Sequence, residues 1–208
     1  MTQLWRLSLV LLLISIAPSG QAADDDLAGK VTRIMGAAMA MQNALPRPLK
    51  VGDEILAGDV LSTGKGARLE VEMIDETILT LGEKAVLVVS EYVMGATPNA
   101  ALRLLQGAFS VTTGKITQVA DASFRVNTEV ATIGVRGTTF WGGVLDGKFQ
   151  VAMLDGKGVY VESRAGRVAL SEAGQGTVIA GPDATPTPPK FWGAGKIERA
   201  LATVNFEN

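Results

Sequence analysis

Apolar and polar residues alternate along one short stretch after another in the middle of this chain. The stretch 68–73 reads Arg-Leu-Glu-Val-Glu-Met, so its three apolar residues fall on one side of an extended strand and its three charged residues on the other. A period of two is typical of a half-buried β-strand, and no helical face can be drawn through this stretch. It predicts one strand of a sheet that has a buried face and an exposed face.

Similar β-type runs follow, and glycines separate them. The chain contains 24 glycines and few apolar stripes of helical length, which predicts an all-β sandwich or barrel. Asp146-Gly147 and Asp155-Gly156 lie between apolar runs, a position typical of tight hairpin turns. The further expected strands cover 77–81, 85–89, 101–105, 108–112, 124–126, 130–133, 138–145, 149–154, 159–161 and 167–170.

The composition changes after residue 180. The segment 181–189 contains four prolines, which cannot donate backbone hydrogen bonds, and it predicts a semi-extended linker. The segment 195–204 places Ile197, Leu201 and Val204 on one face of a short helix. We expect residues 181–208 to form a Pro-rich linker and a C-terminal helix that docks on the β-domain, anchored by Phe191 and Trp192.

The first 23 residues have the pattern of an export signal. Arg6 precedes a short apolar run over 7–17, and Gly20-Gln21-Ala22 has the small-x-small pattern of a cleavage site. The run is shorter than the roughly 20 apolar residues that cross a bilayer, so a signal anchor is the less favoured alternative. We expect cleavage after Ala22 or Ala23, a periplasmic or secreted domain over 24–180, and no stable membrane insertion of the mature chain.

Composition narrows the possible chemistry. The chain has 208 residues with no His and no Cys, which excludes His-based triads, two-His zinc motifs and thiol nucleophiles. The net charge is −2 and no basic block is present, which argues against a nucleic-acid partner. We therefore expect no catalytic residue, no metal site and no cofactor.

Three segments occur in an order that resembles a known family. They are 51–64, 102–109 and 124–140, and the most specific motif is Arg-Gly-Thr-Thr-Phe at 136–140. Together they resemble the FecR domain, the periplasmic part of iron-siderophore signalling regulators that also occurs in exported stand-alone proteins. The resemblance covers about residues 50–180. The anti-sigma segment and transmembrane helix of such regulators are missing from this sequence, so we expect a stand-alone FecR-like protein.

The resemblance implies a jelly-roll-like β-sandwich of short antiparallel strands that acts as a periplasmic binding or scaffold module. It supplies no catalytic residues. The residues that match the family motifs, and for which a structural role is implied, are Gly107, Gly137, Thr138 and Phe140.

Arg136 and Trp141 are the candidate partner-binding residues. Arg136 lies between small residues, where its guanidinium can clamp a carboxylate of a ligand or partner; the alternative is an ion pair across the sheet beside a glycine bulge. Trp141 follows Phe140 on one strand, so the two side chains must point to opposite faces. One of them lies in the core, and the other is covered by the C-terminal helix or exposed for binding.

Three functions are compared on this basis. The leading hypothesis is an exported, non-catalytic binding or scaffold module that recognises an envelope protein or a cell-wall component. The second is a periplasmic sensor component that works with a separate membrane regulator. The third is a glycan-acting enzyme that uses two carboxylates, for which Glu70 and Glu72 on one strand face are the candidates. The favoured explanation of this pair is an exposed polar face opposite the core, for which the alternation is sufficient.

Overall fold

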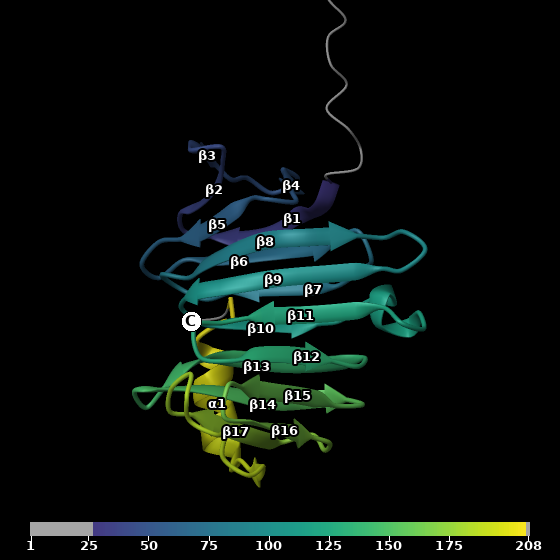
Figure 1. The fold of residues 1–208 in the computed structure, drawn as a ribbon. Coiled ribbons are helices and arrows are strands. Elements are labelled where there is room, and N and C mark those ends of the chain that lie inside the picture. Colours follow the sequence, from purple (N-terminus) through teal and green to yellow (C-terminus); the bar gives the residue numbers. More distant parts are fainter. Residues whose placement is uncertain (1–26, 207–208) are drawn as a thin grey trace, which may run out of the picture.

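The computed structural model of the protein describes residues 27–206 and is built almost entirely of β-strands (Figure 1). The predicted signal peptide, residues 1–23, lies outside the described residues. The strands are β1 (Leu27–Met35), β2 (Ala38–Gln42), β3 (Leu45–Pro48), β4 (Glu54–Leu56), β5 (Val60–Thr63), β6 (Arg68–Met73), β7 (Ile78–Leu81), β8 (Val86–Val93), β9 (Asn99–Gln106), β10 (Phe109–Thr112), β11 (Ser123–Asn127), β12 (Thr132–Val135), β13 (Thr138–Leu145), β14 (Lys148–Gly156), β15 (Val159–Ser163), β16 (Gly166–Leu170), β17 (Gln175–Ile179) and β18 (Lys190–Phe191).

These strands form two sheets of nine strands each, which we call sheet A and sheet B. Sheet A has the order β18-β17-β14-β13-β10-β7-β6-β1-β4, and sheet B has the order β16-β15-β12-β11-β9-β8-β5-β2-β3. The chain crosses repeatedly between the sheets and adds a strand or a hairpin to each in turn. It therefore advances from one end of the stack to the other (Figure 1).

The predicted all-β sandwich is confirmed. In β6 the three apolar residues Leu69, Val71 and Met73 are buried, as the alternation predicts. The sheets are antiparallel except between β9 and β11, which pair in parallel. Of the two predicted hairpin turns, Asp146-Gly147 joins the paired strands β13 and β14.

The second predicted hairpin turn is wrong. Asp155-Gly156 ends β14 in sheet A, and the next strand, β15, belongs to sheet B. The glycine therefore serves a crossover between the layers rather than a hairpin.

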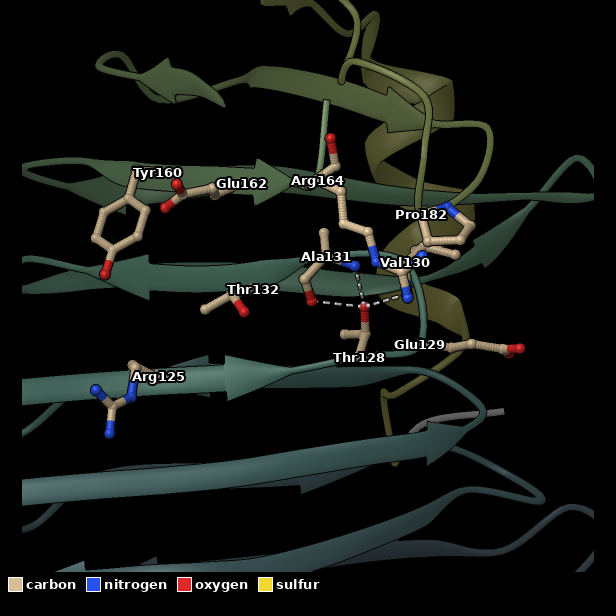
Figure 2. Close-up of a pocket in the computed structure, with 11 residues that line it drawn as sticks. Arg125, Thr128, Glu129, Val130, Ala131, Thr132, Tyr160, Glu162, Arg164 and Pro182 are labelled. Carbon is tan, nitrogen blue, oxygen red and sulfur yellow. Dashed lines mark hydrogen bonds between the residues drawn. The ribbon is translucent and has the colours of Figure 1, made fainter. Parts of the chain in front are cut away.

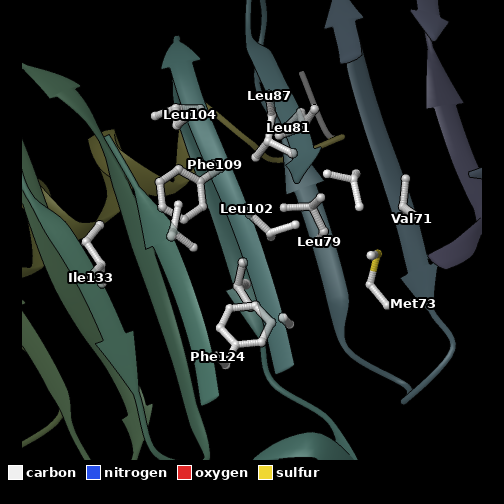
Figure 3. Close-up of a cluster of buried hydrophobic side chains, with 14 of the residues drawn as sticks. Val71, Met73, Leu79, Leu81, Leu87, Leu102, Leu104, Phe109, Phe124 and Ile133 are labelled. Carbon is white, nitrogen blue, oxygen red and sulfur yellow. The ribbon is translucent and has the colours of Figure 1, made fainter. Parts of the chain in front are cut away.

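The hydrophobic core fills the space between the two sheets. Figure 3 shows part of this core, in which Val71 and Leu79 of sheet A belong to the same cluster of buried side chains as Leu102 and Phe124 of sheet B. Phe109 and Phe140 meet edge to face, with their ring centroids 5.6 Å apart. With no disulfide available, burial of this apolar layer is the main force that holds the sheets together.

The C-terminal segment contacts the sandwich at several points. The linker between β17 and β18 hydrogen-bonds to both sheets, because the Thr185 hydroxyl donates to the Ala165 carbonyl and the Thr187 N–H donates to the Val178 carbonyl. The predicted helix is confirmed as α1 (Ala194–Ala202), which lies on the outer face of sheet A (Figure 1). Trp192 is an anchor, as expected, whereas Phe191 is 65% exposed.

Candidate functional site

A groove of about 490 Å³ lies on the outer face of sheet B, near the end of the stack that the chain reaches last (Figure 2). Strands β11, β12 and β15 form its floor, so its residues sit on a rigid frame. Its charged and aromatic lining residues are Arg125, Glu129, Tyr160, Glu162 and Arg164. We call this hollow the sheet B groove.

Gly134, which has no side chain, shapes the floor of the groove. Arg125, Gly134 and Tyr160 are direct neighbours across β11, β12 and β15. A Cβ placed on Gly134 would lie 1.9 Å from the Tyr160 Cζ, so the tyrosine ring lies flat across the glycine. The guanidinium of Arg167 stacks over the same ring, 3.9 Å from its centroid. Glycine, tyrosine and arginine thus hold one another in a fixed arrangement.

The loop 128–131 between β11 and β12 forms one wall of the groove. The Thr128 hydroxyl accepts the N–H groups of Val130 and Ala131 and donates to the Ala131 carbonyl at 2.8 Å (Figure 2). A threonine that binds neighbouring backbone groups in this way fixes a tight turn. Arg164, which follows β15, also lines the groove and pairs with Asp183 at 3.2 Å.

The groove carries charges of both signs. Arg125 donates to the Asn99 side chain at 3.3 Å, and neither it nor Glu129 or Glu162 forms an ion pair with another described residue. These groups can therefore bind polar groups of a partner without first losing an internal ion pair.

A smaller hollow of about 250 Å³ adjoins the groove across Thr128–Val130. It opens at the side of the sandwich, and its lining is mainly apolar. Among its apolar lining residues, Leu105 is 49% exposed and Val144 is 58% exposed. The loop 128–131 thus separates a polar hollow from an apolar one.

Arg136 is exposed but lies outside both hollows. It sits at the crossover from β12 to β13, where its N–H donates to the Gly158 carbonyl at 3.0 Å. Its guanidinium forms no ion pair with the residues from 27 to 206, so the expected pairing across the sheet is not found. Its role in partner binding stays a prediction.

The expectation that Trp141 is a surface residue for binding is wrong in this structure. Phe140 lies in the core and Trp141 on the outer face of sheet A, as the alternation requires, but α1 covers Trp141 and its exposed fraction is 0%. Its indole N–H donates to the Thr203 hydroxyl at 2.9 Å, and its ring lies edge to face against Trp192 at 6.1 Å. The covered alternative is the correct one, and Trp141 and Arg136 do not form one site.

The motif residues hold the crossovers between the sheets. Gly137 has φ +52°, a left-handed conformation that favours glycine. Thr138 is buried, and its hydroxyl lies 2.8 Å from the Arg136 carbonyl oxygen and 2.9 Å from that of Gly158. Gly107 has φ +92°, and a Cβ there would lie 2.6 Å from the Ala85 Cα. The fourth motif residue, Phe140, lies in the core between the sheets.

Replacing Gly137 by Val should lower the free energy of unfolding by about 1–2 kcal/mol, because a β-branched residue fits poorly in the left-handed region. A steric clash does not contribute to this loss of stability, since the atom nearest to a Cβ on Gly137 is 3.8 Å away. Gly137→Asn is the matched control and should cost less, because asparagine tolerates this conformation. Urea denaturation of both variants tests the prediction; equal stability of Gly137→Val and the wild type would contradict it.

The groove residues Arg125, Tyr160 and Glu162 carry no sequence motif that predicts a binding site. They come from strands that are distant in sequence. Arg125 and Gly134 both lie in the motif segment 124–140, but that segment alone does not show that they are neighbours. Glu70 of the proposed acid pair accepts a hydrogen bond from the Thr32 hydroxyl at 2.9 Å, and its carboxylate lies 3.8 Å from the Arg33 guanidinium.

Residues 27–206 contain no group of three acidic side chains placed to hold a metal ion. Over the same range no helix has the length and apolar character needed to cross a bilayer.

The fold and the groove define an all-β sandwich with a polar hollow on the outer face of one sheet. Residues 59–157 match the model of the family described as FecR protein. This segment is therefore similar to the FecR family, and the resemblance seen in the motifs is confirmed over it. The matched segment includes the groove floor on β11 and β12.

Two crystal structures of a protein assigned as an anti-sigma factor from Parabacteroides distasonis share the fold. The first has 17% sequence identity and a TM-score of 0.56, covering 68% of this chain and 63% of that one. The second has 17% identity and a TM-score of 0.54, covering 68% and 64%. The matched region thus spans less than two thirds of the length of these solved chains, and at this identity the likeness shows the fold alone. None of the curated proteins matches the chain.

Proposed function

We propose that this protein is a non-catalytic binding module of the cell envelope with a regulatory role, and that it recognises a partner protein through the sheet B groove. Export to the periplasm, for which the residues before 24 are the expected signal, is part of the proposal. The match to the FecR family model and the fold shared with a protein assigned as an anti-sigma factor support a sensor or regulatory role.

The observation that carries the proposal is the organisation of the groove floor. Tyr160 lies across Gly134 under the guanidinium of Arg167, and Arg125 on the neighbouring strand has no internal ion pair within the described residues. Tyrosine and arginine are enriched where proteins bind one another, because both combine apolar area with directed hydrogen bonds. A preorganised pair of this kind lowers the cost of binding.

Capture from envelope extract tests the proposal. Immobilised wild-type protein should enrich a partner protein, and Tyr160→Ala should reduce its recovery at least tenfold, the loss expected for an interface hot spot. Gly134→Ala should have a similar effect, since its methyl group must displace the tyrosine ring while the backbone stays in place. Quantitative mass spectrometry of the bound proteins provides the measurement.

Glu72→Ala is the matched control, because Glu72 is an exposed residue on the outer face of sheet A and should leave recovery unchanged. An equal loss of partner recovery with Glu72→Ala, or no loss of recovery with Tyr160→Ala, would place the binding surface elsewhere. Enrichment of murein fragments alone would favour a cell-wall ligand. Turnover of a glycan that disappears in Glu162→Gln would show catalysis and overturn the proposal.

A further inference from the structure

The two sheets end in four edge strands, and three of them are poorly suited to pairing with another strand. Strand β3 reads Leu-Pro-Arg-Pro, and its two prolines lack the N–H that a partner strand needs. Strand β4 has three residues and β18 has two. Short strands and prolines are the usual means by which proteins prevent pairing at sheet edges.

The fourth edge, β16, has no such protection. It contains five residues, Gly-Arg-Val-Ala-Leu, without proline, and it pairs only with β15 among the described strands. The hairpin register joins Ser163 to Gly166 across a two-residue turn, which makes this a hydrogen-bonded pair. Hydrogen-bonded pairs alternate along the strand, so the backbone N–H and C=O groups of Arg167 and Ala169 point away from β15. Both residues are exposed.

We infer that β16 is a docking edge for a second copy of this chain. In the proposed dimer the two β16 strands pair antiparallel about a twofold axis at Val168, so that sheet B continues from one subunit into the other. Arg167 of each subunit then forms a hydrogen-bonded pair with Ala169 of the partner subunit. A twofold interface of this type uses the same surface on both subunits and closes on itself.

The residues of β16 complement themselves in this register. Arg167 faces alanine, so the two arginines do not oppose each other, and each guanidinium can stay over the Tyr160 ring of its own subunit. Val168 faces Val168, a β-branched pair suited to neighbouring strands. Gly166 faces Leu170, again a small residue beside a large one. A shift by one residue would place exposed positions against buried ones and remove this match.

The linker limits the length of the docking edge. Thr185 donates to the Ala165 carbonyl and lies beside Gly166, so the free part of the edge runs from Arg167 to Ala169. This contact is much smaller than the roughly 1,200–2,000 Å² of a stable interface. The dimer should therefore be weak, with association that increases with protein concentration.

Disulfide trapping tests the register, because the natural chain has no cysteine. Val168→Cys should form a covalent dimer under mild oxidation, since residues facing each other across a twofold axis bring their Cα atoms within disulfide range. An equimolar mixture of Arg167→Cys and Ala169→Cys should form a disulfide at least tenfold faster than either variant alone. Val51→Cys, a cysteine at a residue that is 64% exposed elsewhere, is the control for random collision.

Adding Ala169→Pro to Val168→Cys should abolish trapping, because proline removes an outward N–H without breaking a bond to β15. Trapping of Val168→Cys no faster than Val51→Cys, together with no gain in the Arg167→Cys and Ala169→Cys mixture, would overturn the inference. The mixture uses exposed positions only, so it remains decisive even if Val168→Cys folds poorly. The test uses purified protein and is independent of partner capture by the sheet B groove.

Discussion

Replacing Asp75 by Asn is expected to lower the free energy of unfolding by about 3 kcal/mol, although the two side chains have nearly the same shape. Asp75 lies in the turn between β6 and β7 and is 1% exposed. Its carboxylate accepts the Thr77 N–H at 3.1 Å and the Ile116 N–H at 3.1 Å, one on each oxygen. It also accepts the hydroxyls of Thr77 and Tyr92.

Asparagine cannot reproduce this arrangement. Whichever way its amide is oriented, the NH₂ group faces one of the two backbone N–H groups, and that donor is left buried without an acceptor. The same carboxylate joins a turn of sheet A, a strand of sheet B through Tyr92, and the 3₁₀ helix Lys115–Gln118. Loss of a hydrogen bond to this carboxylate should therefore destabilise the whole sandwich, and urea denaturation measures that change.

Asp183→Asn is the control for this prediction, since Asp183 forms an ion pair with Arg164 in which both side chains are mostly exposed. Such surface pairs contribute about 0–1 kcal/mol. If Asp75→Asn and Asp183→Asn have the same stability, the buried network does not stabilise the fold.

The Tyr92 phenol adds a pH dependence. Burial, together with the hydrogen bond to Asp75, holds the pKa of Tyr92 far above its ordinary value of 10.0. The folded protein therefore keeps this proton where the unfolded chain loses it, so the contribution of Tyr92 to stability should be constant below pH 10 and fall as the pH rises above it. Tyr92→Phe should remove this part of the alkaline decline. An equal decline in the variant and the wild type would assign it to other groups.

Gly156→Ala is expected to lower the free energy of unfolding by about 4 kcal/mol. Gly156 has φ +107°, and a Cβ there would lie 2.2 Å from the Gly137 carbonyl oxygen and 2.6 Å from the Thr138 Cα. Backbone strain and overpacking each cost about 1–3 kcal/mol. Both neighbouring atoms belong to the backbone of the other crossover, so no side-chain rotation can relieve the contact.

Substitutions of two further glycines distinguish the cost of backbone strain from the cost of overpacking. Gly147→Ala meets no atom within 4 Å but has φ +73°, so it should lose only about 1 kcal/mol through strain. Gly181→Ala meets no atom and needs no left-handed conformation, so its stability should stay within about 0.5 kcal/mol of the wild type. Thermal or urea denaturation of the three variants should rank them in this order. A Gly156→Ala variant as stable as Gly147→Ala would show that the close approach is absent.

Local patterns predicted most of the strands because the alternation of apolar and polar residues within a strand shows which of its faces is buried. The stretch 68–73 needs no partner to show its apolar side, and Asp146-Gly147 contains the residues that its turn conformation requires. Asp155-Gly156 has the same two residues but serves a crossover. The left-handed conformation that glycine supplies is common to both structures, so the dipeptide alone cannot distinguish a hairpin from a change of layer.

The sheet B groove could not be predicted in the same way. Gly134 and Tyr160 are 26 positions apart, and their contact depends on the register in which β12 meets β15. Trp141 shows the same limit, because alternation places it opposite Phe140 but does not show that α1 covers it. Whether an aromatic residue is exposed depends on what packs over its face, and that segment lies more than 50 residues further along the chain.

By itself, the sequence determined the all-β class, the side of each alternating strand that is buried, the C-terminal helix and the FecR motifs. These properties depend on the spacing of residues along a single strand or helix. The tertiary structure alone decided the order of strands in the two sheets, the location of the groove, the cover over Trp141 and the open edge at β16. Each of these depends on which distant segments become neighbours, and that outcome is set by the packing of the whole core.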